Sequence, residues 1–139
     1  MTMGRRPEGV VLLDHDLSVE LAAEPRSAAQ ARYALSRLLS ERGVEGEAKD
    51  FALLVVSELV TNAIRHGRAP IEFRADLTDG VLRIEVSDGE GKSRGAAANY
   101  ADPWSANGRG LAVVEAVSRD WGVTRRGDAG KTVWASLRT

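Results

Sequence analysis

A carboxylate and a side-chain amide stand one helical turn apart in the segment Ser57-Glu-Leu-Val-Thr-Asn-Ala-Ile-Arg-His-Gly67. Glu58 and Asn62 are four residues apart, so both project from the same face if the segment is a helix. Mg²⁺ prefers hard oxygen ligands and keeps several waters, which makes Asn62 a candidate metal ligand. Glu58 is then a candidate base or water-orienting group. A polar pair at the edge of an amphipathic helix has the same spacing, so this pair alone does not establish a site.

Asp88 follows the alternating segment Leu82 to Val86 and precedes two glycines in Asp88-Gly-Glu-Gly91. A carboxylate at the end of a strand can accept an N–H from a ligand while glycine lets the backbone bend away. Aspartate and glycine are also ordinary turn residues, and taken alone a simple turn explains this pattern.

Two further motifs contain glycine. Gly108-Arg-Gly-Leu111 precedes a helical pattern, and a helix start offers free N–H groups and a positive dipole end to an anion such as phosphate. It is not the dinucleotide fingerprint, because no strand leads directly into it, and no Walker-type motif occurs. Later, Thr132 lies on the side of a strand opposite to Val133, where it can bond an adenine edge through water or serve as an ordinary polar strand residue.

Hydrophobic periodicity predicts the elements that position these residues. The strands are expected at 17–22, 71–77, 82–86, 121–126 and 131–138, and the helices at 25–42, 46–66 and 108–120. Hairpin-linked strands beside separate helices predict an α/β two-layer sandwich, in which helices cover one face of a mixed, mostly antiparallel sheet. The long polar and glycine-rich segment 89–107 is expected to be a functional lid or binding loop.

The helix at 46–66 is apolar on two sides and is expected to be largely buried against a sheet or a neighbouring helix. One stripe contains Phe51, Leu54, Val55 and Leu59, and the other contains Leu53, Val56, Val60, Ala63 and Ile64.

Length and composition limit the class of protein. The 139 residues suit one domain, expected at 17–139 after a flexible tail at 1–16. A net charge of -1 argues against general nucleic-acid binding. The sequence has no cysteine, which excludes disulfides, thiolate zinc sites and a cysteine nucleophile. No apolar run reaches the length of a membrane span, so the protein is expected to be soluble and cytoplasmic.

Taken together, the motifs occur in a recognisable order. A helix with Glu-x-x-x-Asn, a strand ending in Asp, a long loop, Gly-x-Gly-Leu opening a helix, and Gly-x-Thr entering a late strand resemble the GHKL or Bergerat ATPase fold of gyrase, histidine kinases and MutL. The resemblance covers about residues 17–138. The phrase from Ser57 to Gly67 is similar to that of the stand-alone anti-sigma serine/threonine kinases of bacteria and their actinobacterial relatives.

This resemblance implies ATP and Mg²⁺ as cofactors and assigns roles by position. Asn62 would hold Mg²⁺, Glu58 would be the catalytic general base, and Asp88 would accept the exocyclic amine of adenine. The remaining nucleotide-binding residues would be Arg65 and His66 at the rim, Gly91, Gly108, Arg109, Gly110 and Leu111 near the phosphates, and Thr132 beside adenine.

Two departures from the family pattern concern phosphoryl transfer. The adenine box of the family is usually Asp-x-Gly-x-Gly, whereas here Gly89 and Gly91 are shifted by one position. Ala106 and Asn107 stand where active kinases of the group often carry an arginine. Transfer depends on neutralising charge that develops on the γ-phosphate, so these departures weaken the case for transfer more than the case for ATP binding.

The leading functional hypothesis is therefore a serine/threonine kinase that regulates transcription through a sigma factor and phosphorylates an anti-anti-sigma protein of the STAS type. A homodimer is expected, without direct nucleic-acid or membrane binding. The alternative is a catalytically inactive nucleotide-binding regulator of the same fold. The catalytic half of a histidine kinase is disfavoured, because neither His15 nor His66 lies in a long helical hairpin pattern.

Overall fold

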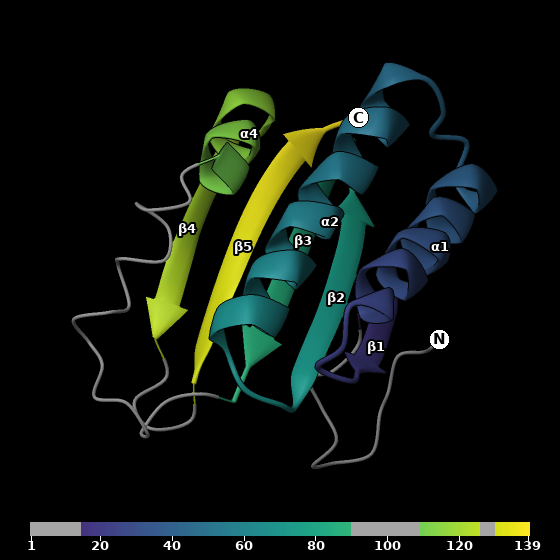
Figure 1. The fold of residues 1–139 in the computed structure, drawn as a ribbon. Coiled ribbons are helices and arrows are strands. Elements are labelled where there is room, and N and C mark those ends of the chain that lie inside the picture. Colours follow the sequence, from purple (N-terminus) through teal and green to yellow (C-terminus); the bar gives the residue numbers. More distant parts are fainter. Residues whose placement is uncertain (1–14, 90–108, 126–129) are drawn as a thin grey trace, which may run out of the picture.

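The structure, a computed structural model, describes residues 15–89, 109–125 and 130–139, with the side chains of residues 109–111 left out. Within these residues eight elements follow one another along the chain (Figure 1). They are β1 (Leu17–Leu21), α1 (Arg26–Glu41), α2 (Glu47–His66), β2 (Ile71–Thr78), β3 (Val81–Asp88), α4 (Arg109–Val117), β4 (Asp120–Arg125) and β5 (Lys131–Arg138). Most of the predicted loop at 89–107 and of the predicted tail at 1–16 lies outside the described residues, which include only Gly89 of the loop and His15 and Asp16 of the tail.

The five strands form one sheet in the order β1-β2-β3-β5-β4. Figure 1 shows α1, α2 and α4 together on one face of this sheet, so the described chain has two layers. This confirms the predicted α/β sandwich. The four ladders between described strands are all antiparallel. The described sheet is therefore entirely antiparallel, whereas a mixed, mostly antiparallel sheet was expected.

His15 and Asp16, at the end of the predicted tail, are held against the sheet. The Asp16 backbone N–H donates to Asp76 Oδ1 at 3.0 Å, and the Leu77 N–H donates to Asp16 Oδ2 at 2.8 Å. His15 Nδ1 lies 2.7 Å from Asp76 Oδ2. These contacts attach the chain to β2 immediately before β1 begins.

The helices α1 and α2 end close to a glycine, at Gly43 and Gly67. After α1, the Gly43 N–H donates to Ser40 O at 3.1 Å, and the Val44 N–H donates to Leu39 O at 2.8 Å. These two bonds form a Schellman motif, which requires a left-handed residue, and Gly43 has a φ of 80°. In α2, the last turn carries Arg65, whose positive charge complements the negative end of the helix dipole.

Replacing Gly43 by alanine is expected to destabilise the domain by about 1–2 kcal/mol, because a Cβ is disfavoured in the left-handed region. An added Cβ would meet nothing within 4 Å, so the cost should come from the backbone alone. Urea unfolding measures this change, with Gly43→Asn as the milder control. An alanine variant as stable as the wild type would show that the turn adopts another conformation.

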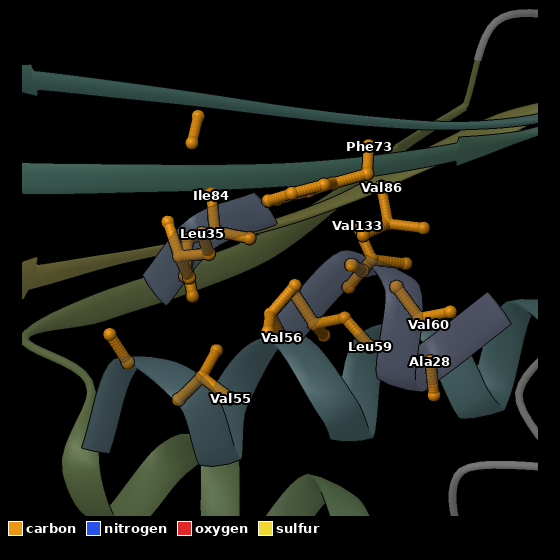
Figure 2. Packing of buried hydrophobic residues seen from close by; sticks show 14 of the residues in the cluster. Ala28, Leu35, Val55, Val56, Leu59, Val60, Phe73, Ile84, Val86 and Val133 are labelled. Atoms are coloured by element: carbon orange, nitrogen blue, oxygen red, sulfur yellow. The ribbon is translucent and has the colours of Figure 1, made fainter. Parts of the chain in front are cut away.

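The core lies between the sheet and the helices. Alternation places Phe73, Ile84 and Val86 on the helix-facing side of the sheet, where they meet Leu35 of α1 and Leu59 of α2 (Figure 2). The largest fully buried side chains include all of these except Val86, which is 2% exposed.

The second apolar stripe predicted on α2 is largely buried, but the first is not. Val55 and Leu59 lie in the core, whereas Phe51 is 37% and Leu54 is 40% exposed. The sheet covers one side of α2 and α1 covers only part of another, which leaves the outer edge of this stripe uncovered. The prediction of burial on both sides was therefore wrong for these two residues.

The last predicted helix is shorter than expected. The prediction extended it to Asp120, but α4 ends at Val117. The Arg119 N–H instead donates to Ser136 O at 2.7 Å, which commits the chain to the sheet one residue before β4 begins.

Candidate functional site

The C-terminal half of α2 supplies the first part of the candidate site. Asn62 is 8% exposed although it is polar, and it lies one turn after the half-buried Glu58. Leu59 and Ala63, next to them in the helix, are buried in the core. The packing of this apolar face therefore fixes the direction in which the carboxylate and the amide project.

The junction of β3 and β5 supplies the second part. Asp88 and Lys131 are register partners at the adjoining ends of the two strands. They continue the inward alternation of Val86 and Val133, so both side chains face the helix layer. Lys131 Nζ donates to Asp88 Oδ2 at 2.5 Å, and the two side chains are only 6% and 2% exposed. The candidate adenine acceptor is therefore an ion-paired carboxylate in the interior of the domain.

Sequence reasoning missed Lys131 as a site residue. The signal was present, because Lys131 has the same parity as Val133, Ala135 and Leu137, which were taken as the inward face. A charged residue that continues an inward alternation must find a partner, and of its two register partners, Asp88 on β3 and Arg125 on β4, only Asp88 has the opposite charge.

The end of α2 packs directly on the end of β3. The Gly89 N–H donates to Arg68 O at 2.8 Å, which links the segment after α2 to the end of β3. A Cβ on Gly67 would lie 2.5 Å from Asp88 Oδ2, so only glycine permits this approach. The backbone after α2, the Asp88 carboxylate and the Lys131 ammonium thus form one compact group.

His66, the last residue of α2, lies within electrostatic range of the same group. Its Nε2 atom is buried and has no hydrogen-bond partner among the described residues. Burial lowers the pKa of His66 from the ordinary value of 6.5, and the positive charges of Arg65 and Lys131 lower it further. The imidazole is therefore neutral at pH 7. Arg65 is exposed. Both residues predicted at the rim, Arg65 and His66, lie in the last turn of α2.

The neutral His66 predicts a pH dependence of stability. Because the folded-state pKa is depressed, the unfolded chain binds more protons than the folded chain once the pH falls through about 6.5. The free energy of unfolding contributed by this group should thus fall as the pH is lowered from about 7 to about 5.5. Urea unfolding of His66→Gln should show a flatter profile over this range than the wild type. Identical profiles would mean that His66 does not carry the effect.

Thr132 lies on the other face of the sheet. It pairs with Ser87 across the ladder, and its Oγ1 lies 2.7 Å from Ser87 Oγ, which also accepts from Arg74 Nη2 at 2.7 Å. Since neighbouring strand residues alternate in direction, Thr132 points away from Asp88. The structure does not bring Thr132 and Asp88 together, and it places Lys131 beside Asp88 instead.

The helix-free face is polar and largely satisfied by its own contacts. Arg74 Nε donates to Glu85 Oε1 at 3.1 Å, and the Arg83 guanidinium lies 4.3 Å from the centre of the Trp134 ring. Burial by itself raises the pKa of Glu85, but the hydrogen bonds from Arg83 and Arg74 outweigh it and lower that pKa overall.

The predicted phosphate motif is described only in part. Gly91 and Gly108 lie outside the described residues. The helix α4 begins at Arg109, and Gly110 and Leu111 belong to its first turn, as the motif predicted. The described part of α4 therefore begins within the glycine motif, as predicted, and the first N–H groups of a helix can receive an anion.

Among the described residues there is neither a candidate metal cluster nor a helix that could span a membrane. No group of three or more histidine, cysteine, aspartate or glutamate side chains is arranged to hold a metal ion there. In the same part of the chain, no helix is long and apolar enough to cross a membrane.

Comparisons with known proteins agree with this architecture. Residues 21–137 match the family model described as "Histidine kinase-like ATPase domain". Among solved structures, the chain is similar to the RsbU and RsbW domains of Rv1364c from Mycobacterium tuberculosis, with 28% sequence identity and a TM-score of 0.67. That match covers 88% of the present chain but only 32% of the other.

A second similar structure is the histidine kinase domain of a blue-light activated histidine kinase from Erythrobacter litoralis. It shares 19% identity at a TM-score of 0.48, and the match covers 82% of this chain and 60% of that one. No curated protein matches the sequence. The family match confirms the resemblance that the order of the motifs predicted.

Proposed function

Because this chain belongs to the histidine kinase-like ATPase domain family, we propose that it binds ATP with Mg²⁺ and transfers phosphate to a serine or threonine of a partner protein. The observation that carries the proposal is the placement of Glu58 and Asn62 one turn apart on α2, on a helix packed against the sheet, in a chain that matches this family over residues 21–137. The domain proposed for this activity comprises residues 17–139.

The donor set fits Mg²⁺ rather than a metal held by a complete protein cage. Mg²⁺ is usually bound by one or two protein oxygens, with waters and substrate phosphates completing the shell. Asn62 offers one amide oxygen at a nearly buried position, and no larger ligand cluster is present among the described residues. When bound, Mg²⁺ would supply positive charge that offsets the negative charge of the phosphates.

The chain's own residues would bind and orient the reactants. Asp88 would accept a hydrogen bond from the exocyclic amine of adenine. Glu58 would accept the proton of the attacking hydroxyl. A general base does this when its carboxylate lies within hydrogen-bond reach of that hydroxyl. The first turn of α4, with Gly108 and Gly110, would place backbone N–H groups near the phosphates, and Arg65, His66, Gly91, Arg109 and Leu111 would border the nucleotide.

We further propose that the protein partners are a sigma factor and an anti-anti-sigma protein of the STAS type, and that the chain acts in the cytoplasm as a homodimer. The similarity to a solved chain that contains an RsbW domain supports this choice of partners. The exposed apolar side chains Tyr33, Phe51 and Leu54 on the helix layer offer a surface for protein contacts.

A nucleotide-binding regulator without transferase activity is the second candidate. The observation that favours it is the sequence before the glycine pair, because Ala106 and Asn107 stand where active kinases of the group often carry an arginine, and transfer depends on neutralising charge on the γ-phosphate. Transfer of label from ATP to a STAS-type protein separates this candidate from the kinase.

Replacement of Asn62 by alanine is expected to weaken Mg-ATP binding about 10- to 100-fold, because it removes the proposed metal ligand. Titration calorimetry with ATP, with and without magnesium, measures the effect. The magnesium dependence of binding should disappear in the variant. Thr61→Ala, on the same helix turn, is the control. Absence of wild-type binding at millimolar ATP, or equal binding by Asn62→Ala, would contradict the proposed site.

A further inference from the structure

We propose that Lys131 is an internal competitor of the nucleotide base, and that its ammonium group sets the affinity and base selectivity of the site by occupying the Asp88 carboxylate. The inference rests on the proposed function, since it takes Asp88 as the residue that recognises the base. It adds a residue to which the order of motifs assigned no role.

The ammonium of Lys131 and the exocyclic amine of adenine are donors for the same acceptor. The exocyclic amine of adenine would reach Asp88 as an N–H donor, and Lys131 Nζ already donates to Asp88 Oδ2 at 2.5 Å. A charged donor makes a stronger hydrogen bond to a carboxylate than a neutral amine does. The ammonium therefore outcompetes the amine at the same oxygen unless the pair opens.

The strand register determines where Lys131 meets Asp88. Lys131 stands opposite Asp88 in the ladder of β3 and β5, so the pair is fixed by strand register and not by a flexible loop contact. Gly67 also lies close to the same carboxylate oxygen, because a Cβ placed there would lie 2.5 Å from Oδ2. A base that takes Oδ2 as its acceptor must therefore compete with Lys131 in a crowded space.

The burial of Lys131 and Asp88 affects how easily the pair can open. Both side chains are almost completely buried, so a lysine moved from Asp88 must find water or another acceptor. The nearby Arg65 is positive and cannot accept a hydrogen bond from the displaced ammonium. Opening the pair therefore opposes binding, and the wild type should gain little from the exocyclic amine.

The test compares two nucleotides on four proteins. Mg-ATP and the magnesium complex of purine riboside triphosphate, which lacks the 6-amino group, are titrated calorimetrically into wild type, Lys131→Gln, Lys131→Met and Lys131→Thr. We expect ATP affinity to rise in the order Lys, Gln, Met, with a gain of about tenfold or more for Met. The preference for ATP over the deaminated analogue should rise in the same order, a selectivity that a change in stability alone would not produce.

Lys49→Met is the matched control, because it removes the same side chain from the first turns of α2, where Lys49 pairs with Glu45. It should leave both affinities unchanged. Circular dichroism establishes that each variant is folded, and Lys131→Thr, which keeps a hydroxyl donor, replaces Lys131→Met if the latter is not.

The outcomes separate the two proposals. Tighter and more ATP-selective binding by the Lys131 variants supports the inference. If these variants bind and the wild type shows no binding at millimolar ATP, the inference stands and the proposed ATP binding by the wild type is overturned. Wild-type binding that depends on magnesium and Asn62, with no gain in folded Lys131 variants, overturns the inference and leaves the proposed function standing. Absence of binding by every folded protein overturns both.

Discussion

Replacement of Glu58 by glutamine is expected to slow phosphoryl transfer by about 100- to 10,000-fold while ATP remains bound, the loss typical of removing a general base. Glutamine has nearly the same shape as glutamate and keeps one oxygen, so the packing of α2 should not change. Only the ability to accept a proton from the attacking hydroxyl is lost. The measurement is the rate at which label from γ-labelled ATP appears on a recombinant STAS-type domain.

Two comparisons make this experiment decisive. Glu47→Gln removes an equal charge from the exposed first turn of the same helix and should transfer label at the wild-type rate. Calorimetry should give both variants the wild-type affinity for Mg-ATP. A normal transfer rate in Glu58→Gln would exclude the carboxylate as base. A loss of ATP affinity equal to the loss of rate would assign Glu58 to binding instead.

The position of Glu58 also explains why its sequence signal was readable. The helix is defined by buried residues on both sides of the motif, such as Val55 and Leu59, and its period of 3.6 residues fixes the direction of each polar residue between them. Local periodicity alone therefore placed Glu58 and Asn62 on one face. Alternation with a period of two likewise predicted the strands at 71–77 and 82–86, in which Phe73 and Ile84 are buried.

Features that depend on contacts between distant segments were not predictable in the same way. Phe51 and Leu54 belong to an apolar stripe, yet exposure depends on where α1 crosses α2, which periodicity does not report. The end of α4 depends on a hydrogen bond from Arg119 to Ser136, which are close only after β5 has joined the sheet. Local sequence propensity therefore predicts neither the exposure of Phe51 and Leu54 nor the end of α4.

Thr132 and Lys131 illustrate the most consequential difference. The motif Gly-x-Thr drew attention to the threonine, but strand alternation directs it to the helix-free face, where it bonds Ser87. The neighbouring lysine faces inward and meets Asp88. A motif identifies which residue types are present, whereas register decides which of them reach the site.

The burial of this pair leads to the second large prediction. Replacing Lys131 by methionine is expected to destabilise the domain by about 3–5 kcal/mol, because it leaves the Asp88 carboxylate buried without its ammonium partner. Urea unfolding, monitored by circular dichroism, measures the change. Lys49→Met, whose ion pair with Glu45 is exposed on the glutamate side, should cost less than about 1 kcal/mol.

A second substitution should restore much of what the first removes. Asp88→Asn together with Lys131→Met eliminates both charges, and a neutral pair of similar volume avoids burying a lone carboxylate, so the double variant should be more stable than Lys131→Met alone. Additive losses would mean that the two residues act independently, and the close ion pair would then not be a determinant of stability. A positive coupling would show that β3 and β5 are joined at the site by a charge pair that the fold itself requires, and ligand binding must then work against part of the folding free energy.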